Sequence, residues 1–271
     1  MTRDPFDLTG RVAVITGGYG VLGGIMAHEL ARAGVRVAVL GRRSDAAEQM
    51  ANELREIAGD AMALTADVLD ADALRGARGA VLERWGQIDI VVNAAGGNVQ
   101  RARTDGVPVF TVPMDALDEV IRLNLQGTML PTLVFAESMA ERGRGSIVNV
   151  SSMAATRSLS GVLGYSVAKG AIDNFTRWMA VDLARRYGDQ LRVNAIAPGF
   201  FVAAQNRGVL VNADGTYTDR ARTIIARTPM GRFGAPRELT GIVRFLCSDA
   251  ASFITGAVIP VDGGFSADGG V

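Results

Sequence analysis

The sequence predicts an α/β fold in which one parallel seven-stranded sheet is covered by helices on both faces. Short apolar runs rich in Val and Ile alternate with helical patterns along the whole chain. These runs are apolar at successive positions rather than at every second one, which is typical of parallel strands that are buried on both faces. A glycine-rich turn joins the first run to the first helical pattern. Together these features predict a doubly wound, three-layer α/β/α domain.

Each predicted element follows from its local pattern. The expected strands are residues 11–16, 35–40, 61–66, 88–92, 146–150, 191–195 and 257–261. The expected helices are residues 25–33, 44–58, 71–85, 115–141, 162–187 and 236–248. No break in composition divides the chain, so we expect a single domain over residues 1–271.

Two segments interrupt the alternation of strand and helix. They span about residues 97–113 and 199–234, and we expect both to be irregular. Long irregular insertions in a compact domain are usually functional. We therefore predict that these segments are the substrate loops.

Composition excludes several classes of function. Lys and Arg number 28, as do Asp and Glu, so no basic surface is indicated for nucleic acid or for a membrane. The single cysteine, Cys247, and the single histidine, His28, argue against a metal centre and a histidine-dependent triad. No stretch has the length and apolar character of a signal peptide or a bilayer span. We expect a soluble cytoplasmic protein without a metal.

The glycine-rich turn is a literal G-x-G-x-x-G from Gly18 to Gly23, placed directly after a strand and opening a helix. Glycines there allow backbone N–H groups to approach a pyrophosphate, and the helix N-terminus adds partial positive charge. This context predicts a dinucleotide site, although a tight turn that only packs the helix has the same pattern.

The end of the second strand indicates which dinucleotide is bound. Proteins that bind NAD commonly carry an acidic residue there for the ribose 2′-hydroxyl, whereas this chain has Gly41-Arg42-Arg43. Arginine pairs with phosphate through two hydrogen bonds, so the sequence favours NADP(H) with its 2′-phosphate. NAD(H) stays open, because two arginines at a helix entry are also compatible with simple solvation.

Tyr165 and Lys169 stand four residues apart in a predicted helix and therefore share a face. An ammonium group beside a phenol lowers the pKa of the phenol toward the range useful for acid/base catalysis. Ser152, at the end of the preceding strand, is expected to hydrogen-bond the same reacting oxygen. Taken alone, the Y-x-x-x-K spacing is also typical of an ordinary helix pair.

The combination of the glycine-rich turn, Asn93-Ala94-Ala95-Gly96, Ser152, Tyr165 and Lys169, in this order, resembles the short-chain dehydrogenase/reductase family. The resemblance extends from about residue 8 to the end. It implies a strand order of 3-2-1-4-5-6-7, a nicotinamide cofactor and a homotetramer.

The resemblance also assigns roles to individual residues. Tyr165 corresponds to the acid/base and Ser152 to the hydroxyl that orients the carbonyl. Lys169 corresponds to the residue that binds the nicotinamide ribose and lowers the tyrosine pKa, and Asn124 to the asparagine that holds a water in the proton relay. These four residues form the predicted catalytic set.

Cofactor contacts are predicted at the glycine-rich turn, at the ends of the second and third strands, after the fourth and sixth strands, and at the catalytic pair. They are Gly17, Gly18, Tyr19, Gly20, Val21, Leu22, Gly23, Arg42, Arg43, Asp67, Val68, Asn93, Ala94, Ala95, Gly96, Tyr165, Lys169, Pro198, Gly199 and Val202. Two positions depart from the family pattern: Val21 replaces a glycine, and the stretch 200–204 lacks the threonine that often touches the cofactor.

A closer similarity is to the D-mannonate oxidoreductase (fructuronate reductase) subgroup. It rests on Gly97-Asn98, on residues 198–201 followed by Gln205-Asn206-Arg207, on residues 228–234 and on residues 260–266. A sugar acid requires a cation for its carboxylate and polar groups for its hydroxyls. We therefore predict substrate contacts at Asn98, Arg101, Ser152, Tyr165, Gln205, Asn206 and Arg207.

These observations predict an NAD(P)-dependent oxidoreductase that interconverts a secondary alcohol and a ketone on a sugar acid, with D-mannonate and D-fructuronate as the favoured pair. A reductase of a ketogluconate, a polyol or a 3-oxoacyl thioester is an open alternative. A nucleotide-sensing protein without catalysis on the same fold is a further one.

Overall fold

The computed structural model describes residues 4–202 and 204–269, except for the side chains of residues 204–206. Its sheet has seven strands in the order β3-β2-β1-β4-β5-β6-β7, and every adjacent pair is parallel. The strands are β1 Val12–Thr16, β2 Arg36–Gly41, β3 Ala61–Thr65, β4 Ile90–Asn93, β5 Arg144–Val150, β6 Gln190–Pro198 and β7 Val258–Val261. The predicted strand order is confirmed, and the chain forms a single Rossmann-like domain.

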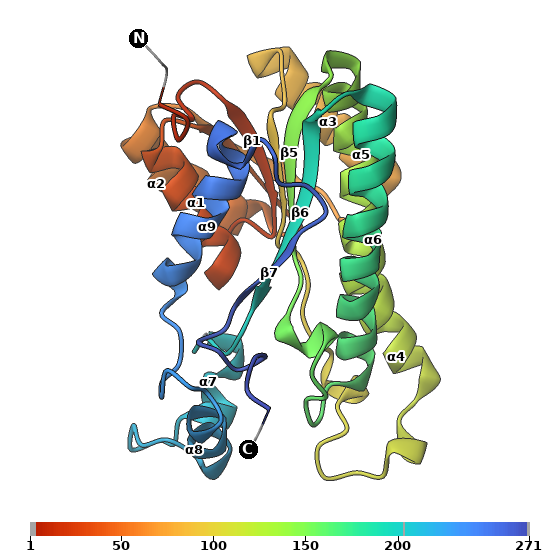
Figure 1. Cartoon of the computed structure of the whole chain (residues 1–271), viewed down its shortest axis with the longest axis vertical. Helices are drawn as coiled ribbons and strands as arrows, with labels where there is room; N and C mark the ends of the chain where they lie inside the picture. The colour runs from red at the N-terminus through yellow and green to blue at the C-terminus, as the bar shows by residue number, and fades with distance from the viewer. Residues whose placement is uncertain (1–3, 203, 270–271) are drawn as a thin grey trace.

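Helices cover both faces of the sheet (Figure 1). One layer consists of α1 Val21–Arg32, α2 Ser44–Ala58 and α9 Thr240–Cys247, and the other of α3 Ala71–Trp85, α5 Gly127–Arg142 and α6 Leu163–Tyr187. α4 Met114–Ile121 precedes α5. Because successive side chains of a strand point to opposite faces, the apolar strands supply two cores, one beneath each helical layer.

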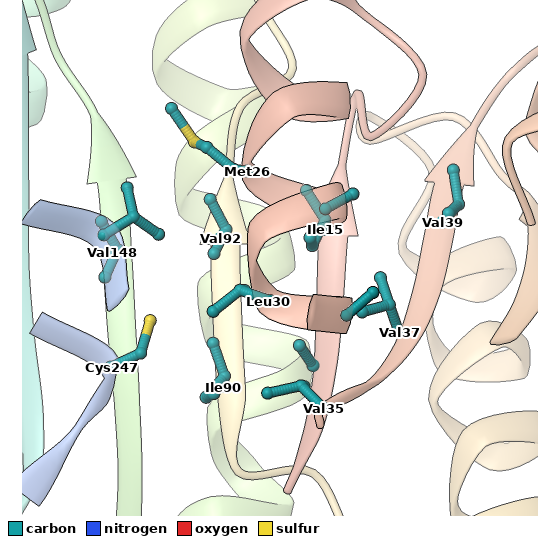
Figure 2. Packing of buried hydrophobic residues seen from close by; sticks show 14 of the residues in the cluster. Ile15, Met26, Leu30, Val35, Val37, Val39, Ile90, Val92, Val148 and Cys247 are labelled. Atoms are coloured by element: carbon teal, nitrogen blue, oxygen red, sulfur yellow. The ribbon is translucent and has the colours of Figure 1, made fainter. Parts of the chain in front are cut away.

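The core beneath α1 shows why these strands are apolar throughout (Figure 2). Ile15 and Val92 from neighbouring strands pack against Met26 and Leu30 of α1, and all four side chains have no exposed surface. Cys247 of α9 closes the same core, and burial raises the pKa of its thiol to about 12. The cysteine is therefore a packing residue with no reactive thiolate at neutral pH.

Two predicted helices are not α-helical throughout. In the helix predicted over residues 236–248, a 3₁₀ turn over Pro236–Leu239 precedes α9. Residues 115–141 were expected to form one helix, and the structure has α4, a π-helical turn over Arg122–Gln126, and then α5. A π-turn inserts one extra residue into the helical ladder, and such turns are frequent at functional sites. Asn124 lies in this turn and is fully buried.

The segment 199–234 is not irregular throughout, which corrects the sequence-based expectation. It contains α7 Ala204–Leu210 and α8 Asp219–Ala226. Thr218 caps α8 by accepting a hydrogen bond from the Ala221 N–H at 3.2 Å. Ala221 and Ile224 of α8 are buried with Leu210 of α7, so tertiary packing stabilises helices too short for a clear pattern. Both helices project beyond the carboxyl ends of the strands (Figure 1).

Candidate active site

The side chains predicted to be catalytic converge at the carboxyl edge of the sheet. Ser152 follows β5, and Tyr165 and Lys169 lie in the first turns of α6. Ser152 and Tyr165 line a cleft of about 340 Å³. Its walls come from the segment after β4, the turns around residues 159–162, the loop after β6, and helices α7 and α8.

Ser152 has a hydroxyl that is held by the backbone. It is the N-cap of a short 3₁₀ turn, Met153–Ala155, and its Oγ accepts a hydrogen bond from the Ala154 N–H at 3.1 Å. A hydroxyl has one donor in addition to its acceptor lone pairs. The Ser152 O–H therefore stays available to donate to an oxygen in the cleft.

Lys169 is buried behind Tyr165. Its Nζ donates to the Val150 carbonyl at 2.6 Å and lies 5.3 Å from the centre of the Tyr165 ring. Burial lowers the pKa of Lys169 to about 8, while the Asp173 carboxylate opposes that shift. The ammonium form therefore predominates at neutral pH, but by a smaller margin than for an exposed lysine.

The expected depression of the Tyr165 pKa is not found in the protein alone. Burial raises the pKa of this phenol above its usual value, and the nearby Ser152 hydroxyl offsets only part of the rise. Removing water disfavours the phenolate more than the surroundings stabilise it. The neutral phenol, which is a proton donor, is thus the form present at physiological pH.

Asn124 is anchored to the turn after β4. Its Nδ2 donates to the Gly97 and Val120 carbonyls at 2.7 and 2.8 Å, and its Oδ1 accepts from the Gly97 N–H at 3.1 Å. The backbone at Gly96 comes so near that an added Cβ would lie 2.7 Å from Asn124 Oδ1 and 3.7 Å from Lys169 Nζ. Asn124, Gly96 and Lys169 therefore form one packed group behind the cleft.

The glycine-rich turn fits the pyrophosphate of a dinucleotide. α1 begins after Gly20 without a side-chain cap and without an acidic residue in its first turn. Its first N–H groups are therefore free of a competing carboxylate. Gly23 packs so closely that a Cβ would lie 2.3 Å from the Gly17 carbonyl, so the turn requires glycine there. Val21, the departure from the family pattern, is the first residue of α1, with 39% of its surface exposed.

The end of β2 presents both arginines to solvent. The Arg43 guanidinium lies 4.8 Å from the centre of the Tyr19 ring, and its backbone N–H donates to Tyr19 Oη at 3.3 Å. Arg42 is exposed beside this stack. The end of β2 therefore carries two guanidinium groups and the Tyr19 hydroxyl. Residues 41–43 include no Asp or Glu.

The remaining predicted cofactor residues lie at the same edge of the sheet. Asp67 Oδ1 accepts from the Leu69 N–H at 2.9 Å, and Val68 is buried after β3. The buried Asn93 side chain donates to Thr132 and Asn149 at 2.8 and 2.9 Å, which fixes it inside the protein at the end of β4. The other members lie at the end of β6 or directly after β4 or β6: Ala94, Ala95, Gly96, Pro198, Gly199 and Val202.

The predicted substrate residues separate into two groups. Asn98 lines the cleft together with Ser152 and Tyr165. Arg101 is absent from that lining; its Nη2 pairs with Asp115 at 2.5 Å and the residue borders a neighbouring pocket. Arg207 is exposed on α7 and is likewise absent from the lining. The side chains of Gln205 and Asn206 lie outside the described part of the chain.

Two other arginines line the cleft where Arg101 and Arg207 were expected. They are Arg103, after the 3₁₀ turn Gln100–Ala102, and Arg220 of α8. Ala102, the last residue of this 3₁₀ turn, is buried against Ala116 and Val120. No local pattern in residues 219–226 marks Arg220 as a cleft residue, because it meets Asp105 from 115 residues away in the sequence.

Comparison with known proteins agrees with this geometry. The family model described as Enoyl-(Acyl carrier protein) reductase matches residues 20–266. A protein from Bacillus subtilis (strain 168), named "Uncharacterized oxidoreductase UxuB", is 43% identical over 275 residues, covering 98% of each chain. The chain belongs to the short-chain dehydrogenase/reductase family. It is an NAD(P)-dependent oxidoreductase of that family.

Solved structures of the family show both cofactors bound. A protein from Haemophilus influenza, provisionally named a D-mannonate oxidoreductase and solved with NAD, superimposes with a TM-score of 0.92 at 39% identity, covering 98% of each chain. A gluconate 5-dehydrogenase from Burkholderia cenocepacia, in complex with NADP and tartrate, has a TM-score of 0.88 at 32% identity and covers 98% of each chain.

In residues 4–202 and 204–269, no three His, Cys, Asp or Glu side chains are grouped so as to hold a metal ion. None of the helices described for this chain has both the length and the apolar character needed to cross a bilayer.

Proposed function

We propose that the enzyme interconverts a secondary alcohol and a ketone on a sugar acid, with D-mannonate and D-fructuronate as the favoured pair. The observation that carries this proposal is the charge of the cleft. Its described lining contains two arginines, Arg103 and Arg220, and no Asp or Glu. An anionic substrate is attracted to such a site, and the amides of Asn98 and Gln100 suit hydroxyl groups. The names of the two solved relatives give additional support.

The proposed reaction assigns one task to each catalytic residue. When bound, a nicotinamide cofactor supplies the hydride for the carbonyl carbon. Tyr165 donates its phenolic proton to the carbonyl oxygen, and the Ser152 O–H hydrogen-bonds the same oxygen. The Lys169 ammonium stabilises the phenolate that remains, since an adjacent cation favours the charged form of a phenol. Asn124 holds the turn at Gly97 in place and supports return of a proton from water.

NADP(H) is the proposed cofactor. Arg42 and Arg43 both stand at the end of β2, where a 2′-phosphate would lie, and guanidinium groups bind phosphate strongly. Arg43 is held in position by its stack on Tyr19. The rival is NAD(H), which is the nucleotide bound in the Haemophilus influenza relative.

The decisive experiment is a matched set of substrates assayed with both cofactors. The purified enzyme would be assayed for oxidation of D-mannonate, D-gluconate, D-mannitol and a 3-hydroxyacyl thioester, and for reduction of the corresponding ketones. We expect the highest kcat/KM for D-mannonate or D-fructuronate with NADP(H). A preference for gluconate would move the assignment to a ketogluconate reductase. Equal rates with neutral polyols would contradict the sugar-acid proposal, and a strong preference for NADH would contradict the cofactor proposal.

We also propose a homotetramer. Helices α5 and α6 expose large apolar side chains on one surface, among them Leu133 and Trp178, with 52% and 61% of their surface exposed. Edge strand β7 is only partly buried, and Phe253 nearby is fully exposed. Two separate apolar surfaces support assembly around two different two-fold axes.

A further inference from the structure

We propose that Arg103 and Arg220 together form the subsite that binds the carboxylate of the substrate, with Asp105 as the shared counter-ion that holds the two guanidiniums side by side. This inference rests on the proposed sugar-acid function and names the residues that would recognise the acid. We call these three residues the arginine clamp.

The first observation is that one carboxylate joins both arginines. Arg103 directs Nε and Nη2 at Asp105 Oδ2, at 2.8 and 2.6 Å. Arg220 Nη1 approaches the other oxygen, Oδ1, at 3.4 Å. The clamp therefore carries two positive charges and one negative charge, and its net charge of +1 matches a single carboxylate.

The second observation is that the backbone fixes this arrangement. Arg220 Nη1 donates to Ser160 Oγ at 3.1 Å and its Nη2 to the Ser160 carbonyl at 3.3 Å. Asp105 lies against the backbone of Gly161, where a Cβ would come within 2.2 Å of Oδ1. The clamp thus connects three walls of the cleft: the segment after β4, the turn before α6, and α8.

The third observation is that donors remain for a ligand. Within the described part of the chain, Arg103 Nη1 and Arg220 Nε have no hydrogen-bond partner. The side chains of Arg103 and Arg220 are 28% and 35% exposed, so they are accessible but partly desolvated. Partial burial strengthens the interaction of a guanidinium with an anion. Asp105 borders the adjacent pocket and is not among the residues that line the cleft, so it takes up only part of the donors of the two arginines.

The other arginines in these loops do not meet these conditions. Arg101 pairs with Asp115 outside the cleft, and Arg222 of α8 pairs with Asp219 at 2.5 Å. Arg222 therefore provides a matched control, because it lies on the same helix two residues from Arg220 and is absent from the cleft lining.

The test compares Arg103→Met, Arg220→Met and the control Arg222→Met with acids and their neutral counterparts. D-mannonate is paired with D-mannitol, which replaces the carboxylate by a hydroxymethyl group. We expect kcat/KM for the acid to fall about 10- to 100-fold in each clamp variant, mainly through KM, because a hydrogen-bonded charge pair is lost. The value for mannitol should change less than about threefold, and Arg222→Met should resemble the unmodified enzyme. Arg220→Lys should lose less activity toward the acid than Arg220→Met does. Lysine keeps the positive charge but lacks the parallel N–H donors of a guanidinium.

A second measurement is independent of turnover. Calorimetric titration of tartrate into the enzyme with bound NADP⁺ should show weaker binding in both clamp variants, while the Kd for NADP⁺ itself stays unchanged. Equal losses for mannonate and mannitol, or unaltered tartrate binding, would overturn the clamp. A preference of the unmodified enzyme for mannitol over mannonate would contradict the proposed function, and therefore also the clamp, which rests on it. If it prefers the acid but the variants do not discriminate, only the clamp fails.

Discussion

At the scale of single residues, the site is governed by how burial and neighbouring charges act on Tyr165 and Lys169. Burial raises the pKa of the phenol and lowers the pKa of the ammonium to about 8. The protein without cofactor therefore keeps Tyr165 neutral and Lys169 close to its titration point at physiological pH. A phenol in this state is suited to donate a proton during carbonyl reduction.

Replacing Tyr165 with Phe removes only the phenolic hydroxyl. We expect kcat for carbonyl reduction to fall about 10²- to 10⁴-fold, which is the usual contribution of a general acid. Steady-state kinetics together with the Kd for NADPH would test this. Tyr217→Phe is the control, since Tyr217 packs against Phe233 outside the cleft lining. Retention of more than a tenth of kcat in Tyr165→Phe would exclude this residue as the proton donor.

Asp173 acts on Lys169 from one turn further along α6. Asp173 is buried and hydrogen-bonded to Ser151, and its negative charge raises the pKa of Lys169 against the effect of burial. Burial raises the pKa of Asp173 above its usual value, while the hydrogen bond from Ser151 and the positive charges of Arg177 and Lys169 oppose that rise. In Asp173→Asn the pKa of Lys169 should therefore drop below about 8.

The consequence is a shift in the pH dependence of activity. If the Lys169 ammonium is required, kcat/KM for reduction declines as pH rises through the pKa of Lys169, and the decline begins at lower pH in Asp173→Asn. A pH profile between about 6 and 10 would measure this. Asp182→Asn, which affects an exposed ion pair on the same helix, should leave the profile unchanged. Identical profiles for Asp173→Asn and the unmodified enzyme would show that Asp173 has no such effect.

At the scale of elements, the π-helical turn Arg122–Gln126 and the turn after β4 form one unit. Asn124 lies within the π-turn, and its amide donates both to the Val120 carbonyl of the same helical segment and to the Gly97 carbonyl. Helix α6 completes the unit, because Lys169 Nζ is near Gly96. Three elements that are distant in the sequence thus support the same few atoms of the site.

Gly96→Ala is the most direct perturbation of this unit. The added methyl would lie 2.7 Å from Asn124 Oδ1, so Asn124 must move. We expect kcat to fall at least about tenfold, with a loss of about 1–3 kcal/mol in the free energy of unfolding from overpacking. Gly76→Ala in α3, where a Cβ meets nothing within 4 Å, is the control.

A double-mutant cycle with Asn124→Ala distinguishes displacement of Asn124 from a general disturbance. Once Asn124 is removed, the methyl group at position 96 has less to displace, so the two effects on kcat should be less than additive. Fully additive effects would mean that Gly96 acts independently of Asn124.

At the scale of the whole molecule, the exposed apolar surface of α5 and α6 is the feature that a single chain leaves unexplained. Trp178 and Val181 on α6 are 61% and 51% exposed, and Leu133 on α5 is 52% exposed. Burying this surface against a second copy would remove these side chains from water.

Trp178→Glu would place a charge in the centre of the apolar surface that we propose as a subunit interface. We expect the mass measured by light scattering to fall to a half or a quarter of the unmodified value, because an unpaired buried charge is costly. Val109→Glu is the control, since Val109 is 50% exposed in the loop before α4. An unchanged mass in Trp178→Glu, or a monomeric unmodified enzyme, would contradict the tetramer.

The sequence by itself determined the order of elements, the parallel sheet and the positions of Ser152, Tyr165 and Lys169. These features depend on local periodicity, on a glycine turn and on spacing within one helix, all of which short stretches of sequence carry. The observed ends of the strands differ from the predicted ends by a few residues. The reason is that the pairing partner, and not the local sequence pattern, decides where a strand ends.

Only the tertiary structure decided which arginines face the substrate cleft. Arg101 and Arg103 are two residues apart, yet one pairs with Asp115 outside and the other lines the cleft. Arg220 joins the same cleft from a helix more than a hundred residues away. The direction of the Tyr165 pKa likewise depends on burial by distant segments. Contacts between remote parts of the chain leave no local periodicity. The sequence therefore identified the predicted catalytic residues, and the tertiary structure identified the side chains that line the cleft around them.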